Sequence, residues 1–232
     1  VFQKLFNKYW SSEKNVIVLG YTCPNFKLEN NFKFVSLGKD RGPKYFSEDV
    51  LRYLNENVKD KYIIHAWDDA PIISKVDQSK IVRLREFMEN NDTFKKACLT
   101  PDLGTRAHLN VNDEFIKASP DADYKLATTW QMWEVDYFKK YLSLDYSPWD
   151  IELKASEIAK NDGFDVLSFK KSCPVNTCNI IRGGKSGRAF IRKNFFKNLG
   201  NYIDYPDMDI IDQKTCLNVF KKHNKIVAMI DR

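Results

Sequence analysis

The stretch YIIHAWDDAP, residues 62–71, places an apolar run directly before two adjacent carboxylates. Its first six residues are bulky or apolar apart from His65, which predicts a buried strand with a hydrogen-bonded core histidine. A buried strand gains nothing from a double negative charge, so Asp68 and Asp69 are expected to hold something. In an open parallel sheet, ligands bind outside the carboxyl ends of the strands, which is where these two carboxylates would lie.

Adjacent carboxylates repel each other unless a cation or hydrogen-bond donors lie between them. Hard divalent cations such as Mn2+ and Mg2+ take oxygen ligands, often one or two carboxylates plus substrate phosphates. We therefore predict that Asp69, with Asp68, binds a divalent metal against a phosphate-bearing ligand. The alternative is that one Asp caps the turn through Asp-Asp-Ala-Pro while the other is solvated.

Strands and helices alternate through the first hundred residues. Apolar runs predict strands at 15–21, 32–38, 62–67 and 96–101, and helical spacing predicts helices over 47–58, capped by Ser47, and 79–90. The second half is mixed, with helices predicted over 130–142 and 147–162, a strand over 164–170 and a last apolar run at 225–230. This pattern predicts an α/β fold with a mostly parallel central sheet flanked by helices. No linker divides the chain, so residues 1–232 are predicted to form a single domain.

The charge balance is mildly basic. Lys and Arg outnumber Asp and Glu by 37 to 31, a formal net charge of +6. The basic residues are scattered, which suits phosphate-bearing ligands or an anionic membrane surface and disfavours nucleic acid as a partner. The five cysteines are irregularly spaced, which predicts buried thiols in a reducing compartment rather than a zinc site. No stretch resembles a membrane span or a signal peptide, so we expect a cytoplasmic location.

A second informative stretch is SPWDIEL, residues 147–153. Ser147 followed by Pro148 predicts a helix start with Ser147 as the cap. Asp150 then lies in the first turn, where an acid complements the helix dipole and can bond back to the cap. The alternative is that Asp150 is a general base directed at a hydroxyl, a role worth about 10²–10⁴-fold in rate.

Together these stretches resemble the nucleotide-sugar glycosyltransferases of the GT-A fold, in order and spacing, over residues 1–185. GPKYFSEDVLRYLNENVKDKYIIHAWDD (42–69) resembles the segment that leads a helix into the strand ending in the family's metal-binding Asp-x-Asp motif. WDIELKASEIAKNDGFDV (149–166) resembles the segment where an acidic pair opens a helix and a glycine precedes the next strand. TTWQMWEVDYFKKYL (128–142) resembles the preceding acceptor-side helix. The combined pattern is similar to a group of bacterial and viral glycan-building transferases.

The resemblance implies a GT-A-like, Rossmann-like domain in which residues 1–100 bind the nucleotide sugar and residues 101–232 bind the acceptor. The first strand of the family's fold would precede Val1. Asp-Asp-Ala stands where the family has Asp-x-Asp, so Asp69 is the expected direct metal ligand, with Asp68 beside it.

The resemblance also implies a catalytic base. In inverting members it is the second acid of the pair that opens the helix, and this position falls on Asp150. Trp149 stands where relatives have the first acid, so Glu152 is a competing candidate for the base.

Donor-binding residues are expected in the loop after the second predicted strand. Asp40, Arg41 and Lys44 lie where the family grips the nucleotide, and Asp68 would join them. The alternative is that these are solvated loop charges. The glycine- and base-rich RGGKSGR, residues 182–188, offers Lys185 to the donor diphosphate, although it lacks the spacing of a P-loop. A hairpin turn with solvated charges is the alternative there.

Acceptor-binding residues are expected among Trp130, Gln131 and Trp149, because aromatic faces offer sugar rings a flat apolar area with a polar edge. Trp133, at helical spacing with Tyr137 and Tyr141, is predicted to lie in the core.

These features predict an inverting, metal-dependent glycosyltransferase. It would move a sugar from a nucleotide-sugar donor to a hydroxyl of a glycan or lipid-linked acceptor, which is compatible with peripheral membrane association. One alternative is a sugar-1-phosphate nucleotidyltransferase, which also uses a sheet, a metal and a nucleotide. Another is a non-catalytic module that binds carbohydrate or nucleic acid.

Overall fold

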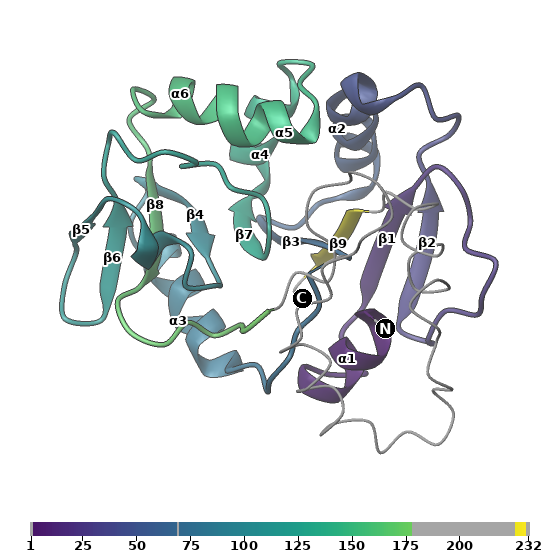
Figure 1. The fold of residues 1–232 in the computed structure, drawn as a ribbon, viewed down its shortest axis with the longest axis horizontal. Coiled ribbons are helices and arrows are strands. Elements are labelled where there is room, and N and C mark those ends of the chain that lie inside the picture. The colour runs from purple at the N-terminus through teal and green to yellow at the C-terminus, as the bar shows by residue number, and fades with distance from the viewer. Residues whose placement is uncertain (1, 69, 178–225, 231–232) are drawn as a thin grey trace, which may run out of the picture.

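Strands and helices alternate along the first hundred residues of the structure, a computed structural model that describes residues 2–68, 70–177 and 226–230 (Figure 1). This part contains α1 (Phe2–Tyr9), β1 (Val16–Gly20), β2 (Phe32–Ser36), the 3-10 turn η1 (Pro43–Tyr45), α2 (Phe46–Asn57), β3 (Tyr62–Trp67), α3 (Gln78–Glu89) and β4 (Phe94–Cys98). The strands and helices predicted here are confirmed, with small shifts in their bounds.

The second half is mixed, as expected. It contains the 3-10 turn η2 (Leu103–Thr105), β5 (His108–Asn110), β6 (Phe115–Ala118), β7 (Gln131–Glu134), α4 (Val135–Leu142), α5 (Pro148–Asp150), the π-helical turn η3 (Ile151–Ala155), α6 (Ser156–Ala159), β8 (Asp165–Phe169) and β9 (Ile226–Ile230). The last apolar run of the sequence is thus a strand.

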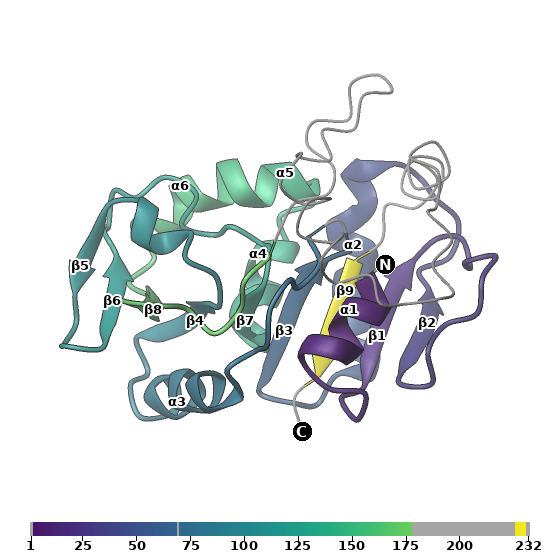
Figure 2. The same cartoon turned by 60° about the horizontal axis from the view of Figure 1, so that its bottom comes forward.

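The strands form one sheet with helices on both faces. Their order is β2-β1-β9-β3-β7-β4-β8-β6-β5. Figure 2 shows α2, α4, α5 and α6 on one face and α1 and α3 on the other. The predicted α/β class is confirmed.

The sheet is mixed, and the prediction of a mostly parallel sheet is wrong. Among the described strands, only the neighbours β1–β2 and β4–β8 are parallel. The other pairs are antiparallel, because β6, β7 and β9 run against their neighbours. The remaining strands share one direction, so their carboxyl ends lie along one edge of the sheet.

Residues 130–142 are not one helix, as the sequence predicts, but a strand followed by a helix. β7 inserts antiparallel between β3 and β4. Met132 and Trp133 are both buried, one in the apolar cluster on each face of the sheet. A strand buried on both faces shows no polar alternation, so periodicity cannot tell it from a helix. The helical pattern holds from α4, which buries Tyr137 and Tyr141, and the predicted core position of Trp133 is confirmed.

The two predicted helix caps differ in outcome. Ser47 does not cap α2, whose N-cap is Tyr45; it is buried in the first turn, and its hydroxyl donates to the backbone carbonyl of Tyr146. This bond ties the start of α2 to the loop before α5. Ser147 does cap α5, in a reciprocal capping box with Asp150.

The apolar core lies in two layers, one on each face of the sheet. One cluster contains Phe6 of α1 and Leu84 of α3 against strand residues such as Ile64. The other contains Leu54 of α2 and Phe138 of α4. It also contains residues of the continuous helix formed by α5, η3 and α6 (148–159), here called the α5–α6 helix. The α5–α6 helix is therefore held against the sheet by burial.

Asp162, just past α6, is a buried carboxylate that ties α4 to this end of the helix. Its Oδ2 accepts hydrogen bonds from Tyr137 Oη at 2.8 Å and Tyr141 Oη at 2.5 Å, and Lys125 Nζ lies 3.7 Å from Oδ1. Burial alone would raise the pKa of this carboxyl. The hydrogen bonds from Tyr141, the Phe164 amide and Tyr137 outweigh burial and hold the pKa below its ordinary value.

Asp162→Asn is expected to lower the free energy of unfolding by about 3 kcal/mol at pH 7, because it leaves Lys125 buried without its counter-charge. The native pKa of the Asp162 carboxyl lies below its unfolded value of about 3.9. Its contribution is therefore complete above that pH and is lost as the pH falls through the native pKa. Urea denaturation at pH 7 and in acid measures both effects. The exposed Asp121→Asn is the control and should change stability by less than about 0.5 kcal/mol. Equal stability of Asp162→Asn and wild type at pH 7 would contradict the assignment.

Candidate active site at the carboxyl edge of the sheet

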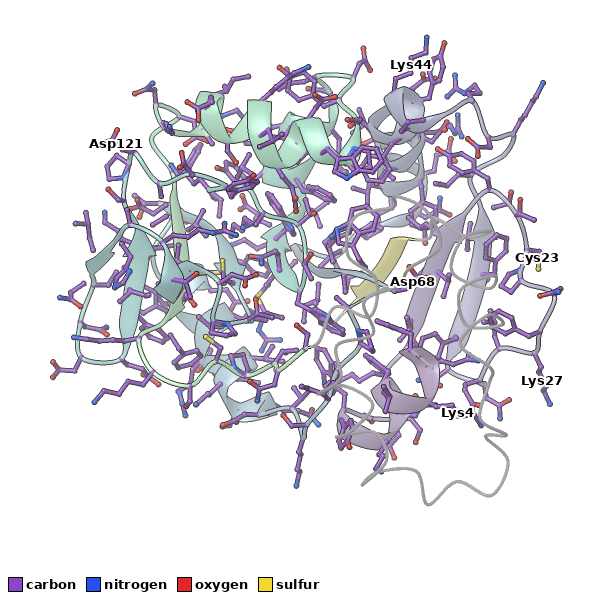
Figure 3. The ribbon with its side chains drawn as sticks, in the orientation of Figure 1. Lys4, Cys23, Lys27, Lys44, Asp68 and Asp121 are labelled. Carbon is purple, nitrogen blue, oxygen red and sulfur yellow. The ribbon has the colours of Figure 1, made fainter. Side chains whose placement is uncertain are left out.

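The carboxyl edge of the sheet brings together the end of β3 and the segment that enters β7. Asp68 follows Trp67, the last residue of β3, and Figure 3 shows it beside β9. β9 begins at this edge, with Ile226 paired to Trp67. Because β7 also runs against β3, residues 124–130, which precede it, cross the same edge.

Thr128 joins the end of β3 to the helix that contains the candidate bases. Its hydroxyl accepts a hydrogen bond from Trp67 Nε1 at 2.8 Å and donates to Glu152 Oε1 at 2.7 Å. Its backbone N–H donates to the same Oε1 at 2.8 Å. A hydroxyl that donates and accepts at once strengthens both bonds. One side chain therefore connects the last residue of β3 to the carboxylate of Glu152.

His65 lies beneath Thr128, fully buried in β3. Its Nδ1 is 2.7 Å from the backbone carbonyl oxygen of Thr128, and a carbonyl only accepts, so Nδ1 holds the proton. Burial lowers the pKa of His65 to about 4; the Thr128 hydrogen bond opposes this change and the charge of Lys96 adds to it. The imidazole is therefore neutral at pH 7, and the prediction of a hydrogen-bonded core histidine is confirmed.

A buried cation, Lys96 of β4, lies on the same face of the sheet. Its ammonium donates to the backbone carbonyl of Lys125 at 3.2 Å, and it lies 4.0 Å from Cys98 Sγ and 5.0 Å from the centre of the Trp133 ring. Burial lowers the pKa of Lys96 to about 8. The segment around Lys125 therefore lies between the positive charge of Lys96 and the α5–α6 helix.

The two candidate bases have different surroundings. Asp150 Oδ2 accepts from Ser147 Oγ at 2.6 Å, and Oδ1 pairs with Lys154 Nζ at 2.8 Å. These contacts, that with Lys154 first, hold the pKa of Asp150 below its ordinary value. The capping role of Asp150 is confirmed, and its role as a base stays a prediction. Glu152 bonds instead to Thr128, on the side of β3.

The predicted donor-binding residues precede α2 and are engaged with their own loop and helix. Asp40 accepts a hydrogen bond from the backbone amide two residues later, at 2.8 Å. Arg41 pairs at 2.6 Å with Asp49, a buried carboxylate in the first turn of α2. Lys44 is exposed at the outer end of α2, and Figure 3 shows it far from Asp68. The structure does not bring Lys44 to the site.

Of the predicted acceptor-binding residues, only Trp149 is exposed, at 60%. Trp130 is fully buried: its ring packs on Phe2 and Trp10, and its Nε1 donates to the backbone carbonyl of Ala70 at 2.6 Å. Gln131 is also fully buried. The prediction that Trp130 and Gln131 contact an acceptor is therefore corrected, because neither offers a surface to one.

Two predicted site residues, Asp69 and Lys185, lie outside the described residues, as does the whole of RGGKSGR. In the part of the chain that the structure describes, no group of three His, Cys, Asp or Glu side chains could hold a metal. Of the two predicted metal ligands only Asp68 is described, and metal binding at this strand end stays a prediction.

Sequence reasoning missed Thr128, Trp67 and Lys96 as parts of this edge. Thr128 bears no local signal, because its role depends on the entry of β7 between β3 and β4. Lys96 begins the stretch KACLTP, and a Lys at the start of an apolar strand is normally expected to be exposed to solvent. Its burial follows from the packing of residues 124–130 over the sheet.

No protein-family model, no curated protein and no solved structure matches the chain. We therefore infer the function from the residues and geometry of this edge. Among the described helices, none is long and apolar enough to cross a bilayer.

The neutral, buried His65 predicts a pH dependence of stability. An unfolded histidine binds a proton near pH 6.5, whereas the native His65 does so only near pH 4. Stability should therefore fall as the pH is lowered from about 6.5 to 4, by on the order of 3 kcal/mol from this group. His65→Asn keeps a donor for the Thr128 carbonyl and should remove this part of the slope.

Urea denaturation between pH 7 and 4 tests this expectation, with the exposed His108→Asn as the matched control. The control should keep the wild-type slope. Identical slopes for His65→Asn and wild type would show that His65 is not held neutral.

Proposed function

We propose that the protein is a nucleotide-sugar-dependent glycosyltransferase whose active site lies at the carboxyl edge of β3. The observation that supports the proposal is the chain of hydrogen bonds from Trp67 through Thr128 to Glu152. It joins the two segments whose sequences resemble the GT-A family, the strand end before the double Asp and the helix that begins at Pro148 and contains Asp150. These segments, 42–69 and 149–166, are 80 residues apart in the chain.

In this proposal the donor diphosphate lies outside the end of β3. Asp68 and Asp69 would hold a divalent metal there, which neutralises charge on the leaving diphosphate when bound. A carboxylate of the α5–α6 helix takes the proton from the acceptor hydroxyl as that oxygen attacks the anomeric carbon. A single displacement of this kind inverts the anomeric centre.

The contacts favour Glu152 over Asp150 as the base. Both oxygens of Asp150 are already engaged, one with Ser147 and the other with Lys154, and its lowered pKa makes it a weaker proton acceptor. Glu152 is held by two bonds to one oxygen, Oε1, on the side that faces β3. Thr128 would fix the carboxylate while Oε2 accepts the proton.

Glu152→Gln is expected to reduce sugar transfer by at least about 10²-fold, because the amide keeps the bonds to Thr128 but cannot accept the proton. Asp150→Asn should retain transfer within a few-fold, since the amide oxygen of Asn can still accept the hydrogen bond from the Ser147 backbone N–H. The measurement is nucleotide release in a donor screen, with metal chelation and with an acceptor panel. Glu157→Gln, an exposed acid of the same helix, is the matched control.

A large loss in Asp150→Asn with normal transfer in Glu152→Gln would assign the base to Asp150. Normal transfer in both variants would rule out a base on this helix. Release of pyrophosphate instead of a nucleoside diphosphate would indicate a nucleotidyltransferase.

A further inference from the structure

Residues 124–130, here called the crossing segment, hold both the side chain and the backbone of Glu152. Thr128 donates twice to Glu152 Oε1, from its N–H at 2.8 Å and from its hydroxyl at 2.7 Å. The N–H of Leu126 donates to Ser156 Oγ at 2.9 Å, and this hydroxyl donates to the backbone carbonyl of Glu152 at 2.6 Å. The position of the Glu152 carboxylate therefore depends on the position of the crossing segment.

The opposite side of the crossing segment is held by two polar side chains of the sheet. His65 Nδ1 donates to the backbone carbonyl of Thr128 at 2.7 Å, and Lys96 Nζ donates to that of Lys125 at 3.2 Å. These donors come from β3 and β4, the strands on either side of β7 (Figure 1). They attach the backbone of the crossing segment to the sheet at two points, three residues apart.

Both side chains cost stability at these positions. His65 is fully buried, and its Nε2 has no hydrogen-bond partner among the described residues. Lys96 is also fully buried, and within the same part of the chain its ammonium contacts a carbonyl, a thiol and an aromatic ring but no carboxylate. An apolar residue would avoid burying an unpaired polar group or charge. Departures from an apolar core of this kind are expected at functional sites.

We propose that His65 and Lys96 are positioning residues that hold Glu152 in place through the crossing segment. Neither side chain bonds to the carboxylate itself. Each holds one carbonyl of the segment, and Thr128 of the same segment holds Oε1. The inference rests on the proposed function, in which Glu152 is the base. A displacement of about 1 Å can cost roughly 10²-fold in rate, so support of this kind has a kinetic effect.

Two substitutions of His65 separate its hydrogen bond from the rest of the side chain. Leu removes the donor to the Thr128 carbonyl, whereas the amide of Asn keeps one. His65→Leu should lower kcat for sugar transfer by about 10- to 100-fold and leave the donor KM within about threefold of wild type. His65→Asn should keep kcat within about threefold of wild type, because the carbonyl is still held. Lys96→Met, which removes the donor to the Lys125 carbonyl, should lower kcat in the same way.

Two comparisons distinguish positioning from a general loss of stability. Ser168→Ala is the matched control, because it removes a buried hydrogen bond to the Cys98 carbonyl that does not involve the crossing segment, and it should keep the wild-type kcat. In a chain that also contains Glu152→Gln, His65→Leu should lower kcat no further, since the base through which it acts is already lost. A change that only destabilised the fold would lower kcat by the same factor in both backgrounds.

Hydrogen exchange at the amides of Leu126 and Thr128 tests the positioning without sugar transfer. Both amides should exchange at least about tenfold faster in His65→Leu and in Lys96→Met, because the crossing segment opens more readily once a carbonyl is released. His65→Asn and Ser168→Ala should exchange as wild type does. Lys96→Met keeps this measurement decisive if His65→Leu does not fold.

Two results would overturn the proposal. One is wild-type exchange at both amides in His65→Leu and Lys96→Met, whether or not the chain transfers sugar. The other is a wild-type kcat in both variants when Glu152→Gln has lost transfer. Normal transfer in Glu152→Gln, or no transfer by the wild-type chain, contradicts the proposed function instead, and hydrogen exchange then decides whether the crossing segment is held as described.

Discussion

The antiparallel entry of β7 between β3 and β4 is the constraint on which the candidate site depends. A strand that runs against its neighbours must be reached from the edge where they end, so residues 124–130 cross the carboxyl edge of the sheet. This crossing places Thr128 between the end of β3 and the α5–α6 helix, and it places Lys125 above the buried Lys96. With a parallel strand in the position of β7, the edge would lack the segment that bonds to both sides of the site.

The sheet beneath this edge contains polar groups that weaken the core. Gln131 of β7 lies opposite His65 of β3 and Cys98 of β4, so these side chains share one face with Lys96. His65 Nε2 and Gln131 Oε1 have no hydrogen-bond partner among the described residues. Such groups cost free energy that an apolar core would not, and their concentration below an edge that gathers carboxylates is typical of functional sites. The apolar layers elsewhere offset that cost.

The sequence predicts the first hundred residues well because there each apolar run is short, bounded by turn residues and matched to one element. It fails where tertiary context decides. The mostly parallel sheet is wrong because β7 and β9 enter between strands that the alternating pattern pairs directly. The prediction of one helix over residues 130–142 is wrong because Met132 and Trp133 are buried on opposite faces of the sheet. Strand β5 bears no pattern of burial, since His108, Leu109 and Asn110 are all exposed. For the site, the sequence located the end of β3 just before Asp68 and the helix start just before Asp150. The role of Thr128 follows only from the fold, and Trp130, predicted to contact an acceptor, lies in the core.

Trp130 has a consequence for the turn that follows β3. Its backbone is in the left-handed region, with φ at 53°, and its indole donates to the carbonyl of Ala70 while the ring packs against α1. A non-glycine residue is held here in a backbone conformation that costs free energy. Trp130 thereby joins the N-terminal helix to the Ala70 peptide, just after the double Asp. Displacing the Ala70 carbonyl would leave the buried Nε1–H of Trp130 without a hydrogen-bond partner, so the position of Ala70 is fixed by the core.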